Sequence, residues 1–266
     1  MARVAIFGSS GMAGTAIARA LAERGHLPVA VGRDRVPGPN GAIDLAGLGR
    51  LDGVVNAVVV KDASAPDAHW INAGFPHALA QACSDASVPL VHLSSDAVLS
   101  AAPGIRDEDC VPMPLDDYGR QKAESEPPSA FVLRFSMVGP EARGFTGLLC
   151  WLLSCQGVVE GFDDHLWNGV SSLELGRQVV ALVENGIRPG LLHLCGETVT
   201  KAGLLALIAE AFQAPLTVRP RPSGVPRDQR LATRHPIQLP PLAKQIAELA
   251  AFADSSGRWK DSLQPR

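Results

Sequence analysis

Short apolar runs alternate with amphipathic segments through the first half of the chain. The runs read RVAIFG, PVAVGR, DGVVNAVVV, PLVHLSS and AFVLRFS, and helical periodicity separates them near residues 12–24, 69–86 and 117–125. Strands that are apolar along their whole length are typical of a parallel sheet covered by helices on both faces. The pattern therefore predicts an α/β fold with a doubly wound parallel sheet.

The second half of the chain has a looser order. We expect helices near residues 144–154, 172–185, 201–212 and 240–253, short strands at GVVEG and LLHLC, and an extended segment rich in proline and arginine before the last helix. We therefore divide the chain into a sheet domain of residues 1–140 and a smaller lobe of residues 141–266, with the segment near 158–195 returning to the sheet.

Composition excludes several classes of partner. The 266 residues carry 24 basic and 27 acidic side chains, a formal charge of −3, so the chain has no general attraction for nucleic acid or an anionic membrane. The five cysteines form no CxxC pair and have no histidines at zinc spacing, which indicates reduced thiols and no metal site. Because we find neither a signal peptide nor an apolar run that could span a bilayer, we expect a cytoplasmic protein.

A glycine-rich loop follows the first strand directly. Gly8, Gly11 and Gly14 enclose Ser9-Ser10 and Met12-Ala13, and a helical pattern begins at once. Glycines at these places let the chain turn tightly and bring backbone N–H groups close to a pyrophosphate at a helix N-terminus. With a strand before it and a helix after it, this loop predicts a dinucleotide site, and its GxxGxxG spacing is that of extended short-chain dehydrogenases.

The end of the second strand reads Val31-Gly32-Arg33-Asp34-Arg35. In a dinucleotide-binding fold this position lies near the adenosine ribose, where an acidic residue favours NAD and an arginine accommodates the extra phosphate of NADP. Arg33 and Arg35 favour NADP(H). Asp34 keeps NAD(H) as the alternative.

The only tyrosine in the chain, Tyr118, stands four residues before Lys122. Residues four apart face the same side of a helix, so the ammonium of Lys122 can lie near the phenol. A nearby cation lowers the pKa of a phenol, which predicts a proton donor and acceptor that works near neutral pH. Asp116 or Asp117 can cap this helix.

Two serines follow the strand PLVHL. Ser94 and Ser95 come at the carboxyl edge of the predicted sheet, where ligands bind in folds of this class. A hydroxyl of Ser95 can bind the same substrate oxygen that Tyr118 protonates.

Together these motifs resemble the dTDP-4-dehydrorhamnose reductase family, whose members are extended short-chain dehydrogenases with an NAD(P)-binding Rossmann fold. The resemblance covers nearly the whole length and has five parts beyond the glycine loop: Gly32-Arg33 with Ile43-Asp44, Val55-Asn56-Ala57 with Ile71-Asn72, Leu90 to Leu99, Met113 to Glu126, and Leu133 to Gly139. It implies NADPH-dependent reduction of a 4-keto group on a nucleotide-linked deoxysugar, by a monomer or a homodimer.

The resemblance also implies a role for individual residues. The implied catalytic residues are Ser95, Tyr118 and Lys122. The implied cofactor contacts are Gly8, Ser10, Gly11, Met12, Gly14, Arg33, Asp44, Leu45, Asn56, Ala57, Val58, Asn72, Ser94, Tyr118, Lys122, Ser136 and Val138. For the substrate we expect Lys61, Trp70, Ser95, Asp96, Ala97, Trp167 and Arg230, with His165 and Arg143 as weaker candidates.

The chain also departs from the pattern of that family. Ala97 stands where the family has a tyrosine, Met113 where it has an asparagine, and Met137 where it has a tryptophan. These changes indicate an altered pocket lining. A sugar epimerase or dehydratase of the same superfamily therefore stays an alternative, although no glutamate follows Asp96 as dehydratases prefer. A non-catalytic, NADP-binding regulatory subunit is a second alternative, against which the complete serine, tyrosine and lysine set weighs.

Overall fold

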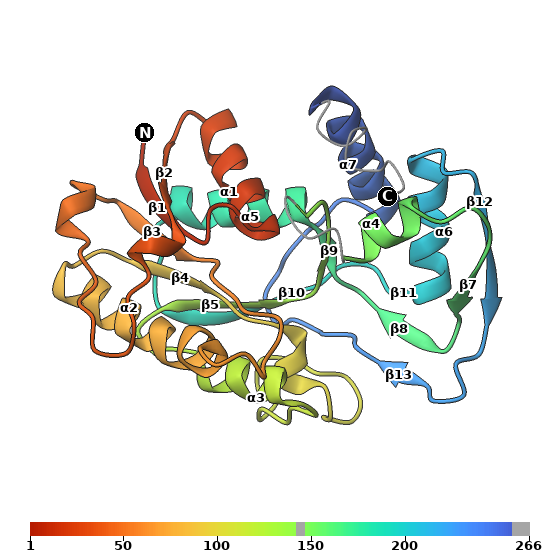
Figure 1. Ribbon diagram of the computed structural model, residues 1–266, viewed down its shortest axis with the longest axis horizontal. Coiled ribbons are helices and arrows are strands. Elements are labelled where there is room, and N and C mark those ends of the chain that lie inside the picture. The colour runs from red at the N-terminus through yellow and green to blue at the C-terminus, as the bar shows by residue number, and fades with distance from the viewer. Residues whose placement is uncertain (142–146, 257–266) are drawn as a thin grey trace.

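A six-stranded parallel sheet forms the centre of the N-terminal half, in a computed structural model that describes residues 1–141 and 147–256 (Figure 1). The strand order is β10-β5-β4-β3-β1-β2, and every neighbouring pair is parallel. The strands are β1 (Arg3–Phe7), β2 (Leu27–Val31), β3 (Gly53–Asn56), β4 (Leu90–Leu93), β5 (Phe131–Phe135) and β10 (Gly190–Leu194). The predicted α/β fold with a doubly wound sheet is confirmed.

The chain changes direction across the sheet at β1. From β1 it moves to β2 on one side, and from β2 it crosses to β3 on the other side of β1. In open parallel sheets such a reversal leaves a crevice beyond the carboxyl ends of the two strands, and ligands bind there. The glycine loop follows β1 and the segment 57–61 follows β3, so both border this crevice.

Helices cover both faces of the sheet (Figure 1). One face carries α1 (Met12–Glu23) and α5 (Ser172–Asn185), and the other carries α2 (Phe75–Asp85) and α3 (Asp117–Glu124). Short helical turns complete this half: η1 (Arg33–Arg35), η2 (Ala46–Leu48), η3 (Trp70–Gly74) and η4 (Asp96–Leu99).

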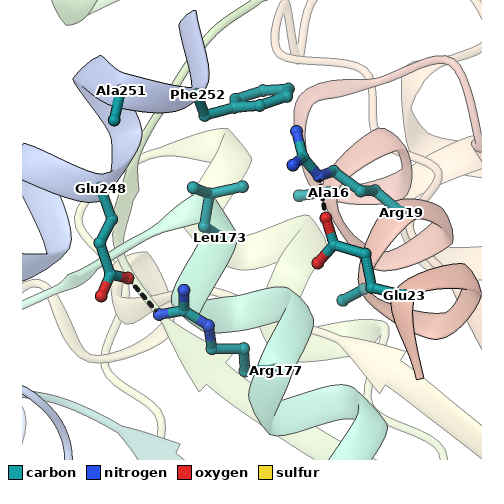
Figure 2. A pocket seen from close by; sticks show the side chains of 9 residues that line it. Ala16, Arg19, Glu23, Leu173, Arg177, Glu248, Ala251 and Phe252 are labelled. Carbon is teal, nitrogen blue, oxygen red and sulfur yellow. Dashed lines mark hydrogen bonds and ion pairs between the residues drawn. The ribbon is translucent and has the colours of Figure 1, made fainter. Parts of the chain in front are cut away.

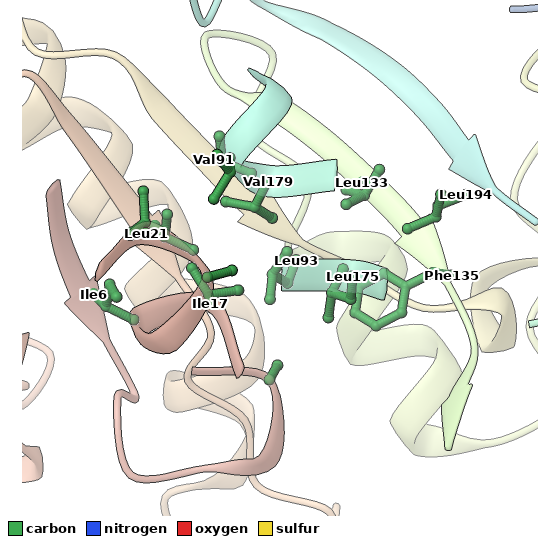
Figure 3. Packing of buried hydrophobic residues seen from close by; sticks show 14 of the residues in the cluster. Ile6, Ile17, Leu21, Val91, Leu93, Leu133, Phe135, Leu175, Val179 and Leu194 are labelled. Atoms are coloured by element: carbon green, nitrogen blue, oxygen red, sulfur yellow. The ribbon is translucent and has the colours of Figure 1, made fainter. Parts of the chain in front are cut away.

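The larger of the two sheet cores lies between the sheet, α1 and α5 (Figure 3). Ile17 and Leu21 of α1 and Leu175 of α5 are fully buried against strand residues such as Ile6 and Leu133. The two helices approach closely because Gly176 has no side chain: a Cβ atom there would lie 2.8 Å from the carbonyl oxygen of Ala16. The face under α2 has a separate core around Phe7 and Phe75.

The C-terminal half forms a second lobe with its own core. Buried apolar side chains from three helices meet Trp167 and Val159 there, including Leu152, Leu204 and Ile246. Small strand pairs frame it: β6 with β9, β7 with β12, and β8 with β11 and β13. Its helices are α4 (Leu148–Leu153), α6 (Lys201–Ala211) and α7 (Leu242–Ser256), and its strands are β6 (Met137–Val138), β7 (Gly157–Phe162), β8 (His165–Trp167), β9 (Val170–Ser171), β11 (Val199–Thr200), β12 (Leu216–Arg221) and β13 (Arg227–Asp228).

The chain passes between the two halves more than once. After β9 it returns to the sheet through α5 and β10, and after β13 the segment 228–234 runs back along the sheet half. There the backbone of Arg234 and the hydroxyl of Thr233 donate to the carboxylate of Glu108, at 3.0 and 2.6 Å. These contacts fix the C-terminal lobe against the end of the sheet.

Helix α7 lies beside α1 and α5 across a hollow of about 290 Å³ (Figure 2). Arg177 of α5 forms an ion pair with Glu248 of α7 at 2.6 Å, and the guanidinium of Arg19 lies 3.9 Å from the ring centre of Phe252. Charged contacts therefore tie this C-terminal helix to the sheet half. None of the described helices is both long and apolar enough to cross a membrane.

Candidate active site

A cavity of about 180 Å³ lies at the carboxyl ends of the central strands, beside the start of α1. It brings together the three predicted catalytic residues: Ser95 follows β4, and Tyr118 and Lys122 lie one turn apart on α3. The remaining wall consists of Ala13, Ala57, Val58, Val59, Lys61, Leu93, Ser94, Asp96, Phe135, Ser136 and Met137. Polar groups therefore converge on one side of a mostly apolar hollow, as in a typical small-molecule site.

Tyr118 stands in the first turn of α3. The carboxylate of Asp116 caps this helix by accepting the backbone N–H of Gly119 at 2.7 Å, as the sequence predicts. Burial raises the pKa of Tyr118 to about 12; the Ser95 hydroxyl lowers it, and the charges of Asp96 and Asp116 raise it. The phenol is therefore protonated at neutral pH and can donate a proton.

Lys122 is almost fully buried, and its ammonium donates a hydrogen bond to the carbonyl oxygen of Leu93 at 2.9 Å. Burial lowers the pKa of Lys122 to about 8, and the nearby Glu126 partly offsets this. We expected this ammonium to lower the pKa of the phenol, and that expectation is wrong for the described structure. The cation is engaged with the backbone of β4, and the desolvation of Tyr118 outweighs the other influences on its pKa.

Ser95 caps the short helix η4 and faces the phenol. Its Oγ accepts the N–H of Ala97 at 3.1 Å and donates to Oδ1 of Asp96 at 3.0 Å. Burial raises the pKa of Asp96, against the influence of Ser95 and of Lys201. A carboxyl group therefore stands next to the two hydroxyls on which a substrate oxygen would bind.

Behind Ser94 lies a buried ion pair that the sequence did not reveal. The Ser94 hydroxyl donates to Glu126 at 2.6 Å, and Arg134 binds the same carboxylate through two nitrogens at 2.8 and 2.7 Å. The guanidinium of Arg134 is buried, so the pair is shielded from solvent. This bidentate contact fixes the serine loop to β5.

The glycine loop has no room for side chains at two positions. Gly8 adopts φ +81°, and a Cβ atom there would lie 2.7 Å from the backbone of Ala57; a Cβ atom on Gly14 would lie 2.2 Å from the carbonyl oxygen of Gly8. The first turn of α1 contains no acidic residue, so its N–H groups present only positive charge, beside the exposed Ser10 and Gly11. These features fit the pyrophosphate of a dinucleotide.

The side chains of Asn56 and Asn72, two of the expected cofactor contacts, hold the loop that follows β3. Asn56 accepts the N–H of Val58 at 3.1 Å, and Asn72 binds both the N–H and the carbonyl oxygen of Val60 at 2.8 Å. Both side chains are buried and neither lines the cavity. The predicted strand at DGVVNAVVV therefore ends at Asn56, because these amides hold the residues after it in a loop.

A second cavity of about 250 Å³ borders the end of β2, where we expect the adenosine ribose. Its wall includes Asp34, Arg35 and Asp44; Arg33 and Arg35 are both exposed, but Arg33 is not part of this wall. Asp44 also accepts the N–H of Gly47 at 2.8 Å, and the side chain of Leu45 is buried. Of the two arginines, Arg35 is therefore the one that the structure brings to this cavity.

Three of the predicted substrate residues are used elsewhere. The indole of Trp167 is buried in the core of the C-terminal lobe and donates to Ser136 Oγ at 2.7 Å, and that of Trp70 donates to the carbonyl oxygen of Pro37 at 2.8 Å. Both guanidinium contacts of Arg230, at 2.9 and 2.7 Å, go to Asp228. None of these three side chains lines the cavity around Tyr118.

The remaining candidates divide between the wall and its surroundings. Lys61 lines the cavity and forms an ion pair with Glu141, whereas Val138 is buried in the core of the second lobe. Met12 and Ala97 do not line the cavity, although their sequence neighbours Ala13 and Asp96 do. His165 packs against Phe162 with a ring separation of 4.6 Å. Arg143 lies outside the described residues.

Lys201 is a site residue that the sequence did not indicate. It is half-buried at the start of α6, its Nζ lies 5.4 Å from the ring centre of Trp167, and it interacts electrostatically with Asp96 across the two halves. Within residues 1–141 and 147–256 its ammonium forms no hydrogen bond or ion pair. Burial lowers the pKa of Lys201, and Asp96 partly offsets this.

Fold and site together define a Rossmann-type α/β protein with the serine, tyrosine and lysine arrangement of a short-chain dehydrogenase. Residues 2–236 match the family described as "RmlD substrate binding domain", and the chain belongs to that family. A dTDP-4-dehydrorhamnose reductase of Mycolicibacterium smegmatis is 27% identical over 98% of this chain and 84% of its own length.

Two further relatives have related descriptions. A dTDP-4-keto-6-deoxy-D-glucose reductase of Streptomyces niveus is 30% identical over 58% of this chain and 57% of its own. The crystal structure of a Bacillus anthracis dTDP-4-dehydrorhamnose reductase in complex with NADP has a TM-score of 0.81 at 17% identity, and covers 95% of this chain and 99% of that one. That structural match shows the same fold.

Proposed function

We propose that this protein reduces the 4-keto group of a nucleotide-linked deoxysugar, with NADPH as the preferred cofactor and NADH as the alternative. The observation that carries the proposal is the cavity in which Ser95, Tyr118 and Lys122 meet beside the glycine loop. Membership of the RmlD family and the two curated reductase relatives support the same reaction.

The cofactor would be held by the glycine loop, the segment 57–61 and the wall around Arg35. Gly8 and Gly14 let the loop pack tightly against Ala57 and against the start of α1, and the N-terminus of α1 supplies N–H donors for a pyrophosphate. When bound, NADPH supplies the hydride. Everything else in the reaction depends on how the side chains of this chain orient the ketone and deliver a proton.

Tyr118 supplies that proton. Its raised pKa keeps the hydroxyl protonated at neutral pH, so it acts as a general acid toward the ketone oxygen as negative charge develops there. Ser95 donates a hydrogen bond to the same oxygen, and Lys122 holds its cation close to the reacting groups. The buried Glu126 and Arg134 fix the serine loop in the geometry this requires.

The position and charge of Lys201 favour a substrate that carries negative charge. It is a half-buried cation without a hydrogen-bond partner in the described part of the chain, and it interacts electrostatically with Asp96 of the cavity wall. A diphosphate provides the acceptors that such an ammonium lacks. The contacts of Arg230 to Asp228 use its Nε and one terminal nitrogen, so only its other terminal nitrogen is left to bind a substrate.

The test is NADPH oxidation with a panel of nucleotide-linked 4-keto-6-deoxy sugars, dTDP-linked ones included. We expect turnover with at least one of them, and a loss on the order of 10²-fold or more in kcat for Tyr118→Phe, which removes only the phenolic oxygen. NADPH binding should survive this substitution. Turnover that persists in Tyr118→Phe, or a wild-type protein that binds NADPH and reduces no ketosugar, would refute the proposal.

A further inference from the structure

His92 is a fully buried imidazole in the middle of the sheet. It lies on β4 between β3 and β5, and both of its ring nitrogens have polar neighbours. Nδ1 is 3.2 Å from the side-chain nitrogen of Asn56, Nε2 is 2.9 Å from Ser125 Oγ, and the ammonium of Lys122 is 3.5 Å from Nε2. A histidine in a strand core is usually structural, but these neighbours belong to two parts of the site.

The direction of each hydrogen bond around His92 follows from its partners. Asn56 Oδ1 accepts the N–H of Val58, so its amide nitrogen faces His92 and must donate to Nδ1. The ring proton is therefore on Nε2 and is donated to Ser125. The Ser125 hydroxyl in turn donates to the carbonyl oxygen of Lys122 at 2.7 Å. A continuous series of hydrogen bonds therefore runs from the loop after β3, through His92, to the end of α3.

The surroundings of His92 keep it neutral. Burial lowers the pKa of His92 well below its usual value, and the positive charges of Lys122 on α3 and His77 on α2 lower it further. A second ring proton would remove the acceptor that Asn56 needs and would place two cations 3.5 Å apart. The tautomer with its proton on Nε2 is thus the form that satisfies both Asn56 and Ser125, while the ammonium of Lys122 has its acceptor in the carbonyl oxygen of Leu93.

We propose that His92 is a positioning residue for the reduction described above: it joins the cofactor loop, through Asn56 and Val58, to the catalytic helix, through Ser125 and Lys122. This inference rests on the proposed function for its kinetic part. Its binding part does not, because the loop that begins at Ala57 lines the cavity whichever substrate is reduced.

Removal of the imidazole should disturb both ends of this series of hydrogen bonds. In His92→Phe the Asn56 amide and the Ser125 hydroxyl lose their partner, so the loop and the helix are free to shift relative to each other. Misplacement of catalytic groups by about 1 Å can reduce turnover roughly 100-fold. We expect NADPH affinity to fall, kcat to fall by about 10- to 100-fold, and the alkaline limb of the kcat profile, which reports Lys122, to move.

Two conservative variants separate the two ends. His92→Asn keeps an acceptor for Asn56 and should retain more NADPH affinity, whereas His92→Gln keeps a donor for Ser125 and should retain more of the wild-type pH profile. The matched control is Leu79→Ala, which removes a fully buried side chain of α2 outside the site. It should lower Tm and leave NADPH affinity and the pH profile unchanged.

The experiment measures NADPH affinity by fluorescence titration, Tm, and kcat as a function of pH for the wild type and these four variants. Weakened NADPH binding in His92→Phe, partly restored in His92→Asn, supports the proposal even when no ketosugar is turned over, which separates its failure from that of the proposed function. Wild-type NADPH affinity and pH profile in His92→Phe would overturn it. Changes of the same size in the NADPH affinity and pH profile of Leu79→Ala would also overturn the proposal. If His92→Phe does not fold, the proposal is overturned when both His92→Asn and His92→Gln have the NADPH affinity and pH profile of the wild type.

Discussion

The ammonium of Lys122 donates to the carbonyl oxygen of Leu93 at 2.9 Å. This bond holds the cation at the carboxyl end of β4, under the cavity, in surroundings that otherwise disfavour charge. Lys122, to which we assign a catalytic role, is therefore a residue that the fold tolerates rather than one that stabilises it. Functional groups of this kind commonly reduce stability.

We predict that Lys122→Met stabilises the protein at neutral pH. The folded-state pKa of about 8 lies below the ordinary value of 10.5, so folding disfavours the charged form of Lys122 by roughly 3 kcal/mol. The variant avoids this penalty but loses the hydrogen bond to Leu93, which reduces its gain in stability by about 1 kcal/mol. Below pH 8 both states carry the proton and the full penalty applies. Between about 8 and 10.5 the folded state sheds it, so wild-type stability rises relative to the variant. Urea unfolding across this range measures the difference, and a gap that does not change with pH would contradict the prediction.

Arg35 should determine the preference for NADPH over NADH. It lines the cavity at the end of β2 together with Asp34 and Asp44, and its guanidinium is the cation there that can bind a 2′-phosphate. We expect Arg35→Gln to weaken NADPH binding about 10-fold or more and to leave NADH binding nearly unchanged. Arg33→Gln is the matched control, since Arg33 is as exposed as Arg35 but is not part of the cavity wall. A larger effect at Arg33 would reverse this assignment.

Lys201→Met should raise KM for the nucleotide sugar and leave the dissociation constant of NADPH unchanged. The substitution keeps the length of the side chain but removes the charge that we assign to the substrate diphosphate. A lost charge-assisted contact of about 1.5 to 3 kcal/mol corresponds to roughly a 10- to 100-fold rise in KM. Lys244→Met, on the exposed side of α7, should change neither quantity. Steady-state kinetics and NADPH titration measure both, and an unchanged KM for Lys201→Met rules out this contact.

Gly14→Ala should abolish dinucleotide binding. The added methyl group would lie 2.2 Å from the carbonyl oxygen of Gly8 and 2.7 Å from Ser9 Cα, so the glycine loop must move away from α1. Since both contacts are backbone atoms, the shift should also lower Tm. Gly38→Ala, where a Cβ atom meets nothing within 4 Å, serves as the control. Calorimetric titration with NADPH checks the prediction, which fails if Gly14→Ala binds like the wild type.

The fold could be predicted from the sequence because its signals are local. Apolar runs mark each strand of the parallel sheet, and the Asp116 cap and the glycine loop identify the starts of α3 and α1. The cavity also contains the serine, tyrosine and lysine that the spacing suggested. Each of these follows from residues close to one another in the chain.

Trp167, Arg230 and Lys201 have contacts that the sequence did not reveal. Trp167 reads as an aromatic residue in a polar segment, but the second core and Ser136 Oγ use both its ring and its N–H. Arg230 reads as a free cation, but its guanidinium donates two hydrogen bonds to the carboxylate of Asp228, two residues before it. Lys201 gives no signal at all, because only the folded chain brings it near Asp96. A sequence shows which groups can bond and not which of them are already bonded.

The return of α5 and β10 to the sheet bears on how the chain folds during synthesis. Leu175 and Val179 cover Ile17 and Leu21, yet they emerge from the ribosome only after the first strands of the other lobe. Until then the side of α1 that packs on α5 is uncovered. A nascent chain that stalls near residue 140 would therefore expose an apolar surface to which chaperones can bind and through which the chain can aggregate. The nucleotide-binding half is thus completed late, by a segment that has already passed through its neighbour.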